Sequence, residues 1–198
     1  MQPFILAIAG GTGSGKSTLA DGLSKIYSEE TLVIHLDDYL RPPPELPTLK
    51  GHLNWDHPDA VNSPQLGADL SSLKNGNDSE ITRKDPDAKR PFKVYGARKR
   101  VKVRPQKLII LEGFLALYYP ELRKLYDYSI YLDAPFDTHI GRRVHFINDD
   151  YRDEVIKHMH KQYVETSKQY ADQVIDAMAN SSQAVLAAAQ SALKSRLA

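Results

Sequence analysis

The sequence predicts an α/β fold in which helices flank a doubly wound parallel β-sheet. Three features of the 198-residue chain lead to this prediction. Short apolar runs rich in β-branched residues alternate with longer segments of helical periodicity, which is typical of α/β architectures. Within these runs the residues are continuously apolar, so each strand should be covered on both faces. A glycine-rich loop also follows the first run, at the sheet edge where such folds bind ligands.

The expected strands are the apolar runs at residues 4–9 (FILAIA), 31–36 (TLVIHL), 107–113 (KLIILEG), 128–133 (YSIYLD) and 172–176 (DQVID). The expected helices cover residues 17–27, 64–74, 135–147, 153–169 and 181–197. In the last of these, Val185, Ala189 and Leu193 recur every four residues and give the helix one apolar face for packing. The length suits a single domain over residues 1–198.

The loop after the first strand carries a phosphate-binding motif. Gly10, four further residues, Gly15, Lys16 and Ser17 match G-x-x-x-x-G-K-[ST] between a strand and a helix. In this geometry backbone N–H groups and the helix N-terminus converge on a polyphosphate. Lys16 would reach the β- and γ-phosphates, and the Ser17 hydroxyl would bind Mg²⁺. We therefore expect a P-loop NTPase whose phosphate-binding residues are Gly10, Gly11, Thr12, Gly13, Ser14, Gly15, Lys16, Ser17 and Thr18.

Residues 38–106 interrupt the alternation of strands and helices. The stretch RPPPELP at 41–47 cannot form a helix or a central strand, because proline lacks an N–H donor and fixes φ. KNGND at 74–78 is a turn, and residues 90–95 and 100–105 are expected to form the arms of a hairpin around Gly96. Long excursions between core strands are usually functional, so we expect this one to bind the second substrate.

Acidic residues follow two strands at the same edge of the predicted sheet. Asp37 and Asp38 come at the end of the second strand, and Glu112 ends the strand at 107–113. A small-molecule kinase needs a carboxylate that takes the acceptor's hydroxyl proton and an acidic group near the metal. The N-K-x-D and D-x-x-G signatures of GTPases do not occur. The sequence therefore favours a small-molecule kinase among the P-loop proteins.

Composition is that of a globular protein without a membrane partner. Hydrophobic residues make up 41% and charged residues 26%, and no stretch approaches the roughly 20 apolar residues of a membrane span. The net charge of +1 argues against nucleic acid as the main partner. The absence of cysteine excludes disulfides and thiolate metal sites and fits a reducing compartment. We expect a cytoplasmic protein.

Five stretches together give a family resemblance. They are HLDDYLRP (35–42), LNWDHPDAVNSPQL (53–66), KVY (93–95), LEGFLALYYPELRKLYDYSIYLDAPFDTHIGRRV (111–144) and YVETSKQYADQVI (163–175). With the phosphate loop, they make the sequence similar to the uridine kinases, within the uridine kinase and phosphoribulokinase group. The resemblance implies that ATP, with Mg²⁺, phosphorylates the 5′-hydroxyl of uridine or cytidine. It also implies a homo-oligomer, commonly a tetramer.

The resemblance implies roles for individual residues. Asp37 matches the catalytic base, and Ser17 and Glu112 match the magnesium sphere. Trp55 and Asp56 match an aromatic and acidic pair that holds base and ribose, Tyr95 lines the acceptor pocket, and Arg142 and Arg143 reach the phosphates. The catalytic set is thus Asp37, Lys16 and Arg142, with acceptor binding by Asp37, Trp55, Asp56 and Tyr95.

Two segments depart from the family pattern. The chain after Tyr95 (YGARKRVKVRP) is shorter and lacks a histidine that contacts the pyrimidine, and the lid at 145–155 is also short. Basic residues dominate 83–107, which indicates either an exposed charged hairpin or a pocket for an anionic acceptor. Two alternatives to a uridine kinase therefore stay open. One is a kinase of the same group acting on another hydroxyl, such as that of a sugar phosphate or hydroxy acid, and the other is a non-catalytic nucleotide-binding regulator.

Overall fold

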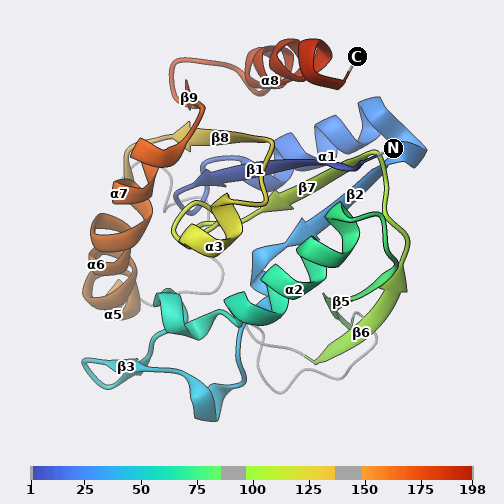
Figure 1. The fold of residues 1–198 in the computed structure, drawn as a ribbon. Helices are drawn as coiled ribbons and strands as arrows, with labels where there is room; N and C mark the ends of the chain where they lie inside the picture. Colours follow the sequence, from blue (N-terminus) through green and yellow to red (C-terminus); the bar gives the residue numbers. More distant parts are fainter. Residues whose placement is uncertain (1, 86–96, 137–148, 198) are drawn as a thin grey trace.

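A parallel sheet of five strands forms the centre of the computed structural model, which describes residues 2–85, 97–136 and 149–197 (Figure 1). All of its strand pairs are parallel. The strand order is β2-β7-β1-β8-β9. Each strand lies where the sequence predicts it, so the doubly wound P-loop fold is confirmed. The strands are β1 (Phe4–Gly10), β2 (Thr31–His35), β7 (Leu108–Glu112), β8 (Tyr128–Asp133) and β9 (Gln173–Asp176).

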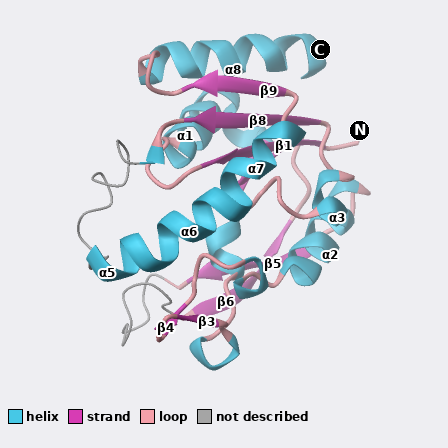
Figure 2. Ribbon diagram, turned by 90° about the vertical axis from the view of Figure 1, so that its left-hand side faces the viewer, coloured by secondary structure: helices cyan, strands magenta, loops and turns pink. Residues whose placement is uncertain are grey.

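The two faces of the sheet bury two separate apolar clusters. Successive residues of a strand point to opposite faces, so Ile5 and Ala7 join one cluster while Leu6 and Ile8 join the other. The first face is covered by α2 (Ser63–Lys74) and α3 (Pro120–Arg123), and the second by α1 (Lys16–Tyr27) and α8 (Ser182–Leu197) (Figures 1 and 2). This double burial explains why the strands read as continuous apolar runs.

A long helical segment runs from Asp149 to Tyr170 beside the sheet (Figure 2). The helix expected at 153–169 therefore exists but begins earlier, whereas the one expected at 135–147 lies almost wholly outside the described residues. Two stretches of the segment have the wider π-helical hydrogen bonding. Its parts are α5 (Asp149–Tyr151), η6 (Arg152–Ile156), α6 (Lys157–Met159), η7 (His160–Val164), α7 (Glu165–Ser167) and η8 (Lys168–Tyr170).

The excursion after β2 consists of short elements and one helix. The proline-rich stretch forms only a single 3-10 turn, and the chain turns at Gly76 with φ of 79°, directly after α2, as the sequence predicts. A 3-10 turn, η1 (Ser28–Glu30), precedes β2. The elements of the excursion before α2 are η2 (Leu36–Tyr39), η3 (Pro43–Glu45), β3 (Thr48–Leu49), β4 (His52–Leu53) and η4 (Pro58–Ala60).

In the described residues, the second arm of the expected hairpin pairs with a strand that the sequence did not predict. The strand β6 (Arg98–Val103) pairs antiparallel with β5 (Ser79–Lys84), from Ser79 opposite Val103 to Lys84 opposite Arg98. The expected partner, residues 90–95, lies outside the described residues. Strand β5 was missed because its sequence, SEITRK, has no apolar alternation and Ile81 is its one buried residue. Tertiary packing of Ile81, not a sequence pattern, fixes this strand.

A helix that crosses a bilayer has to be both long and predominantly apolar. No helix within residues 2–85, 97–136 and 149–197 combines these two properties.

Candidate active site

The phosphate loop connects β1 to α1 at the carboxyl edge of the sheet. Gly15, the residue before α1, has φ of 95°, a left-handed conformation that glycine adopts without the strain of a side chain. This turn lets the helix begin at Lys16, directly after the loop. The Lys16 ammonium group bends back and donates a 2.7 Å hydrogen bond to the carbonyl oxygen of Gly11. The loop therefore lies between a buried strand and a helix N-terminus, which is the structural context that its motif requires.

His160 packs against the backbone of this loop from the long helical segment. A methyl group on Gly11 would lie only 2.7 Å from Cε1 of His160, so the imidazole takes the space that a side chain would need. The ring also contacts Phe136, with centroids 5.1 Å apart. Burial lowers the pKa of His160 below its ordinary value, and the Lys16 charge acts in the same direction. The neutral imidazole is thus the favoured form at this position.

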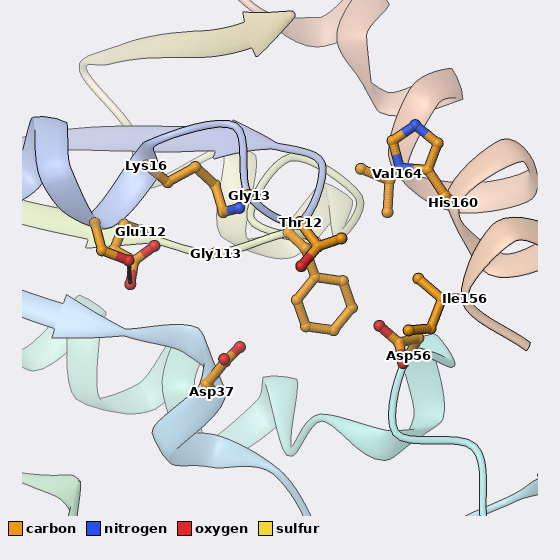
Figure 3. A pocket seen from close by; sticks show the side chains of 12 residues that line it. Thr12, Gly13, Lys16, Asp37, Asp56, Glu112, Gly113, Ile156, His160 and Val164 are labelled. Atoms are coloured by element: carbon orange, nitrogen blue, oxygen red, sulfur yellow. Dashed lines mark hydrogen bonds between the residues drawn. The ribbon is translucent and has the colours of Figure 1, made fainter. Parts of the chain in front are cut away.

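A cavity of about 220 Å³ opens beside the loop, and its walls come from the loop with the start of α1, from the excursion after β2, from β7 with the residues that follow it, and from the long helical segment (Figure 3). Lys16 and Ser17 come from α1, Asp37 from the segment after β2, Glu112 from β7 and Asp56 from the excursion. Figure 3 shows Asp37, Asp56 and Glu112 around the same space as Lys16. The remaining lining residues are Thr12, Gly13, Gly113, Phe114, Ile156, His160 and Val164.

Glu112 is held in place by two hydrogen bonds at the end of β7. Its Oε1 lies 2.7 Å from Nδ1 of His35, its register neighbour on β2, and accepts a 3.2 Å hydrogen bond from the Ser17 hydroxyl. Burial alone would raise the pKa of Glu112, but the His35 hydrogen bond and the Lys16 charge outweigh it and lower the pKa. The same hydrogen bond raises the pKa of His35. An ionised carboxylate therefore faces the phosphate loop.

Ser17 and Glu112 are suited to Mg²⁺. Magnesium prefers oxygen ligands and is usually held by one or two protein groups together with nucleotide phosphates. The hydroxyl and the carboxylate come from different elements, yet their oxygens lie 3.2 Å apart and both residues line the first cavity. Their chemistry and placement fit a metal held between the protein and a bound triphosphate.

Asp37 and Asp38 differ sharply in their surroundings. Asp37 lines the cavity, whereas Asp38 is 4% exposed and its Oδ1 accepts a 3.3 Å hydrogen bond from the backbone N–H of Lys84. Burial raises the pKa of Asp38. Arg98 on β6 donates hydrogen bonds to the carbonyl oxygens of both residues, at 2.9 Å to Asp37 and 3.3 Å to Asp38. The hairpin β5–β6 thus holds the backbone that presents Asp37.

Asp56 reaches the cavity from the loop between β4 and η4. Its Oδ2 accepts a 2.9 Å hydrogen bond from the hydroxyl of Tyr151, at the start of the long helical segment. Trp55 is half-buried, packs against the core and is not among the residues that line this cavity. Of the expected aromatic and acidic pair, only the acidic member therefore faces this space.

A second cavity, of about 310 Å³, adjoins the phosphate loop. It shares Gly13, Lys16 and Ser17 with the first cavity. Its other walls come from the loop and the start of α1, from the end of β8, from the chain between β9 and α8, and from the start of α8. The additional lining residues are Ser14, Gly15, Thr18, Leu19, Leu132, Ala177, Asn180, Ser182 and Val185.

Comparison with protein families identifies the group to which this site belongs. Residues 5–187 match the model of the phosphoribulokinase / uridine kinase family. The chain belongs to this family. The predicted resemblance is therefore confirmed, over nearly the whole sequence.

Individual relatives agree with this assignment. The uridine kinase of Clostridium botulinum (strain Langeland) is 35% identical over 191 residues, and that of Clostridium novyi is 34% identical over 190 residues; each alignment covers 88% of both chains. A solved structure from Bacillus stearothermophilus, described as a possible uridine kinase, has a TM-score of 0.66 at 22% identity, covering 89% of this chain and 90% of that one. The phosphoribulokinase of Rhodobacter spheroides has a TM-score of 0.63 at 12% identity, covering 89% and 72%. These two structures share the fold.

Several predicted residues of this family member lie outside the part of the chain that the structure describes. They are Tyr95, Arg142 and Arg143, together with residues 145–148 of the expected lid. The rest of that lid, from Asp149, is the start of the long helical segment. The roles of these residues remain predictions from the resemblance.

Three residues at the site were missed by sequence reasoning. His35 contacts Glu112, Tyr151 donates a hydrogen bond to Asp56, and His160 packs against the phosphate loop. The only available signal was weak: His35 immediately precedes the strand end that carries Asp37, and His160 stands four residues from both Ile156 and Val164 on a helix. No spacing rule links Tyr151 to a residue 95 positions earlier.

Proposed function

We propose that this protein is an ATP-dependent kinase that phosphorylates the 5′-hydroxyl of uridine or cytidine. The observation that carries the proposal is the single cavity that unites phosphate-loop groups, Lys16 and Ser17, with the carboxylates Asp37 and Asp56. A kinase needs the donor phosphates and the acceptor hydroxyl in one space. Identity of 34–35% to uridine kinases over 88% of the chain supports the choice of acceptor.

In the proposed reaction Asp37 is the general base. The acceptor's 5′-oxygen bonds to the γ-phosphorus while the bond from that phosphorus to the β–γ bridging oxygen breaks. ADP leaves, and the hydroxyl proton passes to Asp37. Lys16 stabilises the charge on the transferring phosphoryl group. Mg²⁺, when bound, supplies further charge neutralisation, and Ser17 and Glu112 would hold it.

The remaining predicted residues complete the two substrate sites in this proposal. Asp56 would accept hydrogen bonds from the ribose hydroxyls, with Trp55 and Tyr95 completing the acceptor side. Arg142 and Arg143 would bind the phosphates. The second cavity, next to the phosphate loop, suits the nucleoside part of ATP, because it shares the loop with the first cavity and extends away toward Ala177 and Asn180.

The charges around the first cavity favour a neutral acceptor over an anionic one. Asp37, Asp56 and Glu112 contribute three carboxylates, and Lys16 is the only lysine or arginine among the described lining residues. Three of the described arginines of the basic segment bind protein groups instead, and the first of them, Arg83, donates to the carbonyl of Val33. Arg98 donates to the backbone of the Asp37 segment, and Arg100 pairs with Asp69. Sugar phosphates would meet repulsion here, and the intact Lys16, Asp37 and Glu112 argue against a non-catalytic regulator.

An acceptor panel tests the proposal. ADP production would be followed with uridine, cytidine, adenosine, pentose phosphates and small hydroxy acids, and the product would be identified by ³¹P NMR. We expect 5′-monophosphates of uridine and cytidine, and no activity in Lys16→Ala. Turnover of a phosphorylated acceptor that exceeds turnover of both pyrimidine nucleosides would reject the proposed acceptor.

The resemblance also supports two proposals about the state of the protein. We infer a homo-oligomer, commonly a tetramer in this family, which light scattering after size-exclusion chromatography would test. We also infer a cytoplasmic location, from the cysteine-free sequence, which fits a reducing compartment. Fractionation of cells that express the protein would check that location.

A further inference from the structure

The long helical segment forms one wall of the first cavity through a single row of side chains. Ile156, His160 and Val164 follow one another at intervals of four residues and all line the cavity (Figure 3). Two stretches of this segment, Arg152–Ile156 and His160–Val164, are π-helical. Such wider turns are rare and occur frequently at functional sites. The segment therefore belongs to the site, although sequence reasoning assigned no site residue to it beyond the lid.

At the start of the segment, one hydroxyl group connects both members of the expected acceptor-binding pair. The Tyr151 hydroxyl donates a 2.9 Å hydrogen bond to Oδ2 of Asp56 and accepts a 3.0 Å hydrogen bond from the backbone N–H of Trp55. A phenol can donate once and accept as well, so both bonds form at the same time. The bond to the carboxylate is charge-assisted and therefore among the stronger hydrogen bonds.

Neighbouring contacts join the same two elements. The ring of His52, on β4, and the ring of Tyr151 pack in a T-shaped arrangement with centroids 5.7 Å apart. His52 Nε2 lies 3.3 Å from a carboxylate oxygen of Glu154, and the Lys50 ammonium lies 3.8 Å from its other oxygen. The loop that carries Trp55 and Asp56 is thus attached to the first turns of the helix at several points.

From this geometry we infer that Tyr151 is a positioning residue for the acceptor: its hydroxyl fixes the Asp56 carboxylate and the Trp55 backbone in the orientation that receives the ribose. The inference rests on the proposed function. An aspartate side chain on a loop has several rotamers available, and the hydrogen bond from Tyr151 favours one of them. Holding it before the substrate arrives reduces the entropy lost on binding. Tyr151 touches no reacting atom and acts through Asp56.

The helix does not depend on Tyr151 for its own packing. Val155, Met159 and Val164 are 0%, 4% and 3% exposed and anchor the segment, whereas Tyr151 is half-buried at its first turn. Asn54 adds a further bond between loop and helix, to the sulfur of Met159 at 3.2 Å. Removing only the phenolic oxygen should therefore leave the fold intact.

The test is Tyr151→Phe, with Tyr163→Phe as the matched control. Tyr163 lies on the same segment, its ring packs edge-on against His57 and Tyr118, and its hydroxyl makes no hydrogen bond with the described residues. For Tyr151→Phe we expect the KM for uridine to rise roughly tenfold, the scale of one hydrogen bond to a charged group. The kcat and the KM for ATP should stay within about twofold, because neither the base nor the phosphate loop changes. Tyr163→Phe should match the parent protein in the KM for uridine, in the kcat and in the KM for ATP.

A second measurement needs no activity, because Trp55 is the only tryptophan of the chain. Its fluorescence and its quenching by acrylamide report directly on the loop between β4 and η4, which carries Trp55 and Asp56. We expect stronger quenching in Tyr151→Phe and no change in Tyr163→Phe, with both melting temperatures near that of the parent protein. Unchanged fluorescence in Tyr151→Phe would overturn the inference whether or not the protein phosphorylates nucleosides. Altered fluorescence in a protein inactive on every nucleoside would instead reject the proposed function and support the tie between Tyr151 and the loop.

The route through Asp56 is tested by a double-mutant cycle. If Tyr151 acts by orienting the Asp56 carboxylate, Tyr151→Phe should add little to the KM defect of Asp56→Ala. Full additivity of the two changes would contradict the inference, as would a loss of kcat at unchanged KM in Tyr151→Phe.

Discussion

Arg98 donates a 2.9 Å hydrogen bond to the backbone carbonyl of Asp37, across 61 positions of the sequence. This contact links the basic hairpin to the proposed general base and gives the guanidinium a role other than binding an anionic substrate. We therefore expect Arg98→Gln to lower kcat by about tenfold with little change in the KM for uridine, because a misplaced base costs rate more than affinity.

The control for Arg98 is Lys102→Gln, an exposed cation on the same strand. It should leave kcat unchanged, and activity should depend equally weakly on salt in the parent protein and both variants. A steep loss of activity with salt that disappears in Arg98→Gln would instead mean that the hairpin attracts an anionic acceptor.

The two consecutive aspartates should differ in mutagenesis as they do in structure. Asp37→Asn should lower kcat by at least about a hundredfold, the usual scale for loss of a general base, with modest change in ATP affinity. Asp38→Asn should change kcat by less than about threefold, because Asp38 is buried away from the cavity and an amide oxygen can still accept the Lys84 N–H. Steady-state kinetics of both variants shows which aspartate is the general base. A larger loss of kcat in Asp38→Asn than in Asp37→Asn would assign the base to Asp38.

Lys16→Ala should abolish phosphoryl transfer, because no other described lysine or arginine lines the first cavity. Lys16 also bonds to the Gly11 carbonyl, so a small loss of stability is expected as well. Lys25→Ala, an exposed lysine in the last turn of the same helix, is the matched control. The comparison uses single-turnover rates and thermal unfolding. Undiminished transfer by Lys16→Ala would remove the phosphate-loop assignment.

His160 should make stability depend on pH. Burial lowers its pKa in the folded protein below the ordinary value of 6.5. At pH values between this lowered pKa and 6.5, the unfolded chain therefore binds more protons than the folded protein. The contribution of His160 to the free energy of unfolding is fully present above pH 6.5 and is lost as the pH falls toward the pKa of the folded protein. Lys16, Glu165 and Asp133 are the charged groups that act on this ring.

The pH effect is measured by denaturant unfolding at pH 7.5 and pH 5. The loss of stability between them should be smaller in His160→Gln than in the parent protein. His158→Gln, an exposed histidine on the same segment, should behave like the parent. Equal losses in all three proteins would show that His160 does not contribute.

The acceptor site should discriminate weakly among bases. The sequence after Tyr95 is short and lacks the histidine that the family resemblance implies for contact with the pyrimidine, and a site with fewer polar partners rejects analogues poorly. We expect uridine and cytidine to be phosphorylated with similar kcat/KM and a high KM. Asp56→Ala should reduce kcat/KM for every nucleoside by the same factor, because in the proposed site Asp56 binds the ribose and not the base. Tight and selective turnover of uridine alone would show that another residue has replaced the histidine.

The sheet and the phosphate loop can be predicted from local sequence patterns alone. The strands β1, β7 and β8 are continuous apolar runs because both faces of the sheet are buried, and that signal is local. The loop is also local: its glycines, Lys16 and Ser17 lie within eight consecutive residues, and their spacing fixes the turn. The acidic residues at the strand ends followed from the same local pattern.

Which of these residues come into contact depends on how distant segments pack together. Strand β7 inserts between β1 and β2, which places Glu112 beside both Ser17 and His35, and no local pattern specifies that order. The pairing of β5 with β6 and the contact of Tyr151 with Asp56, 95 positions apart, likewise depend on packing between distant segments. Such contacts form only when packing of the core brings the segments together. Bringing distant segments of the chain together costs conformational entropy, and a single hydrogen bond does not offset that cost.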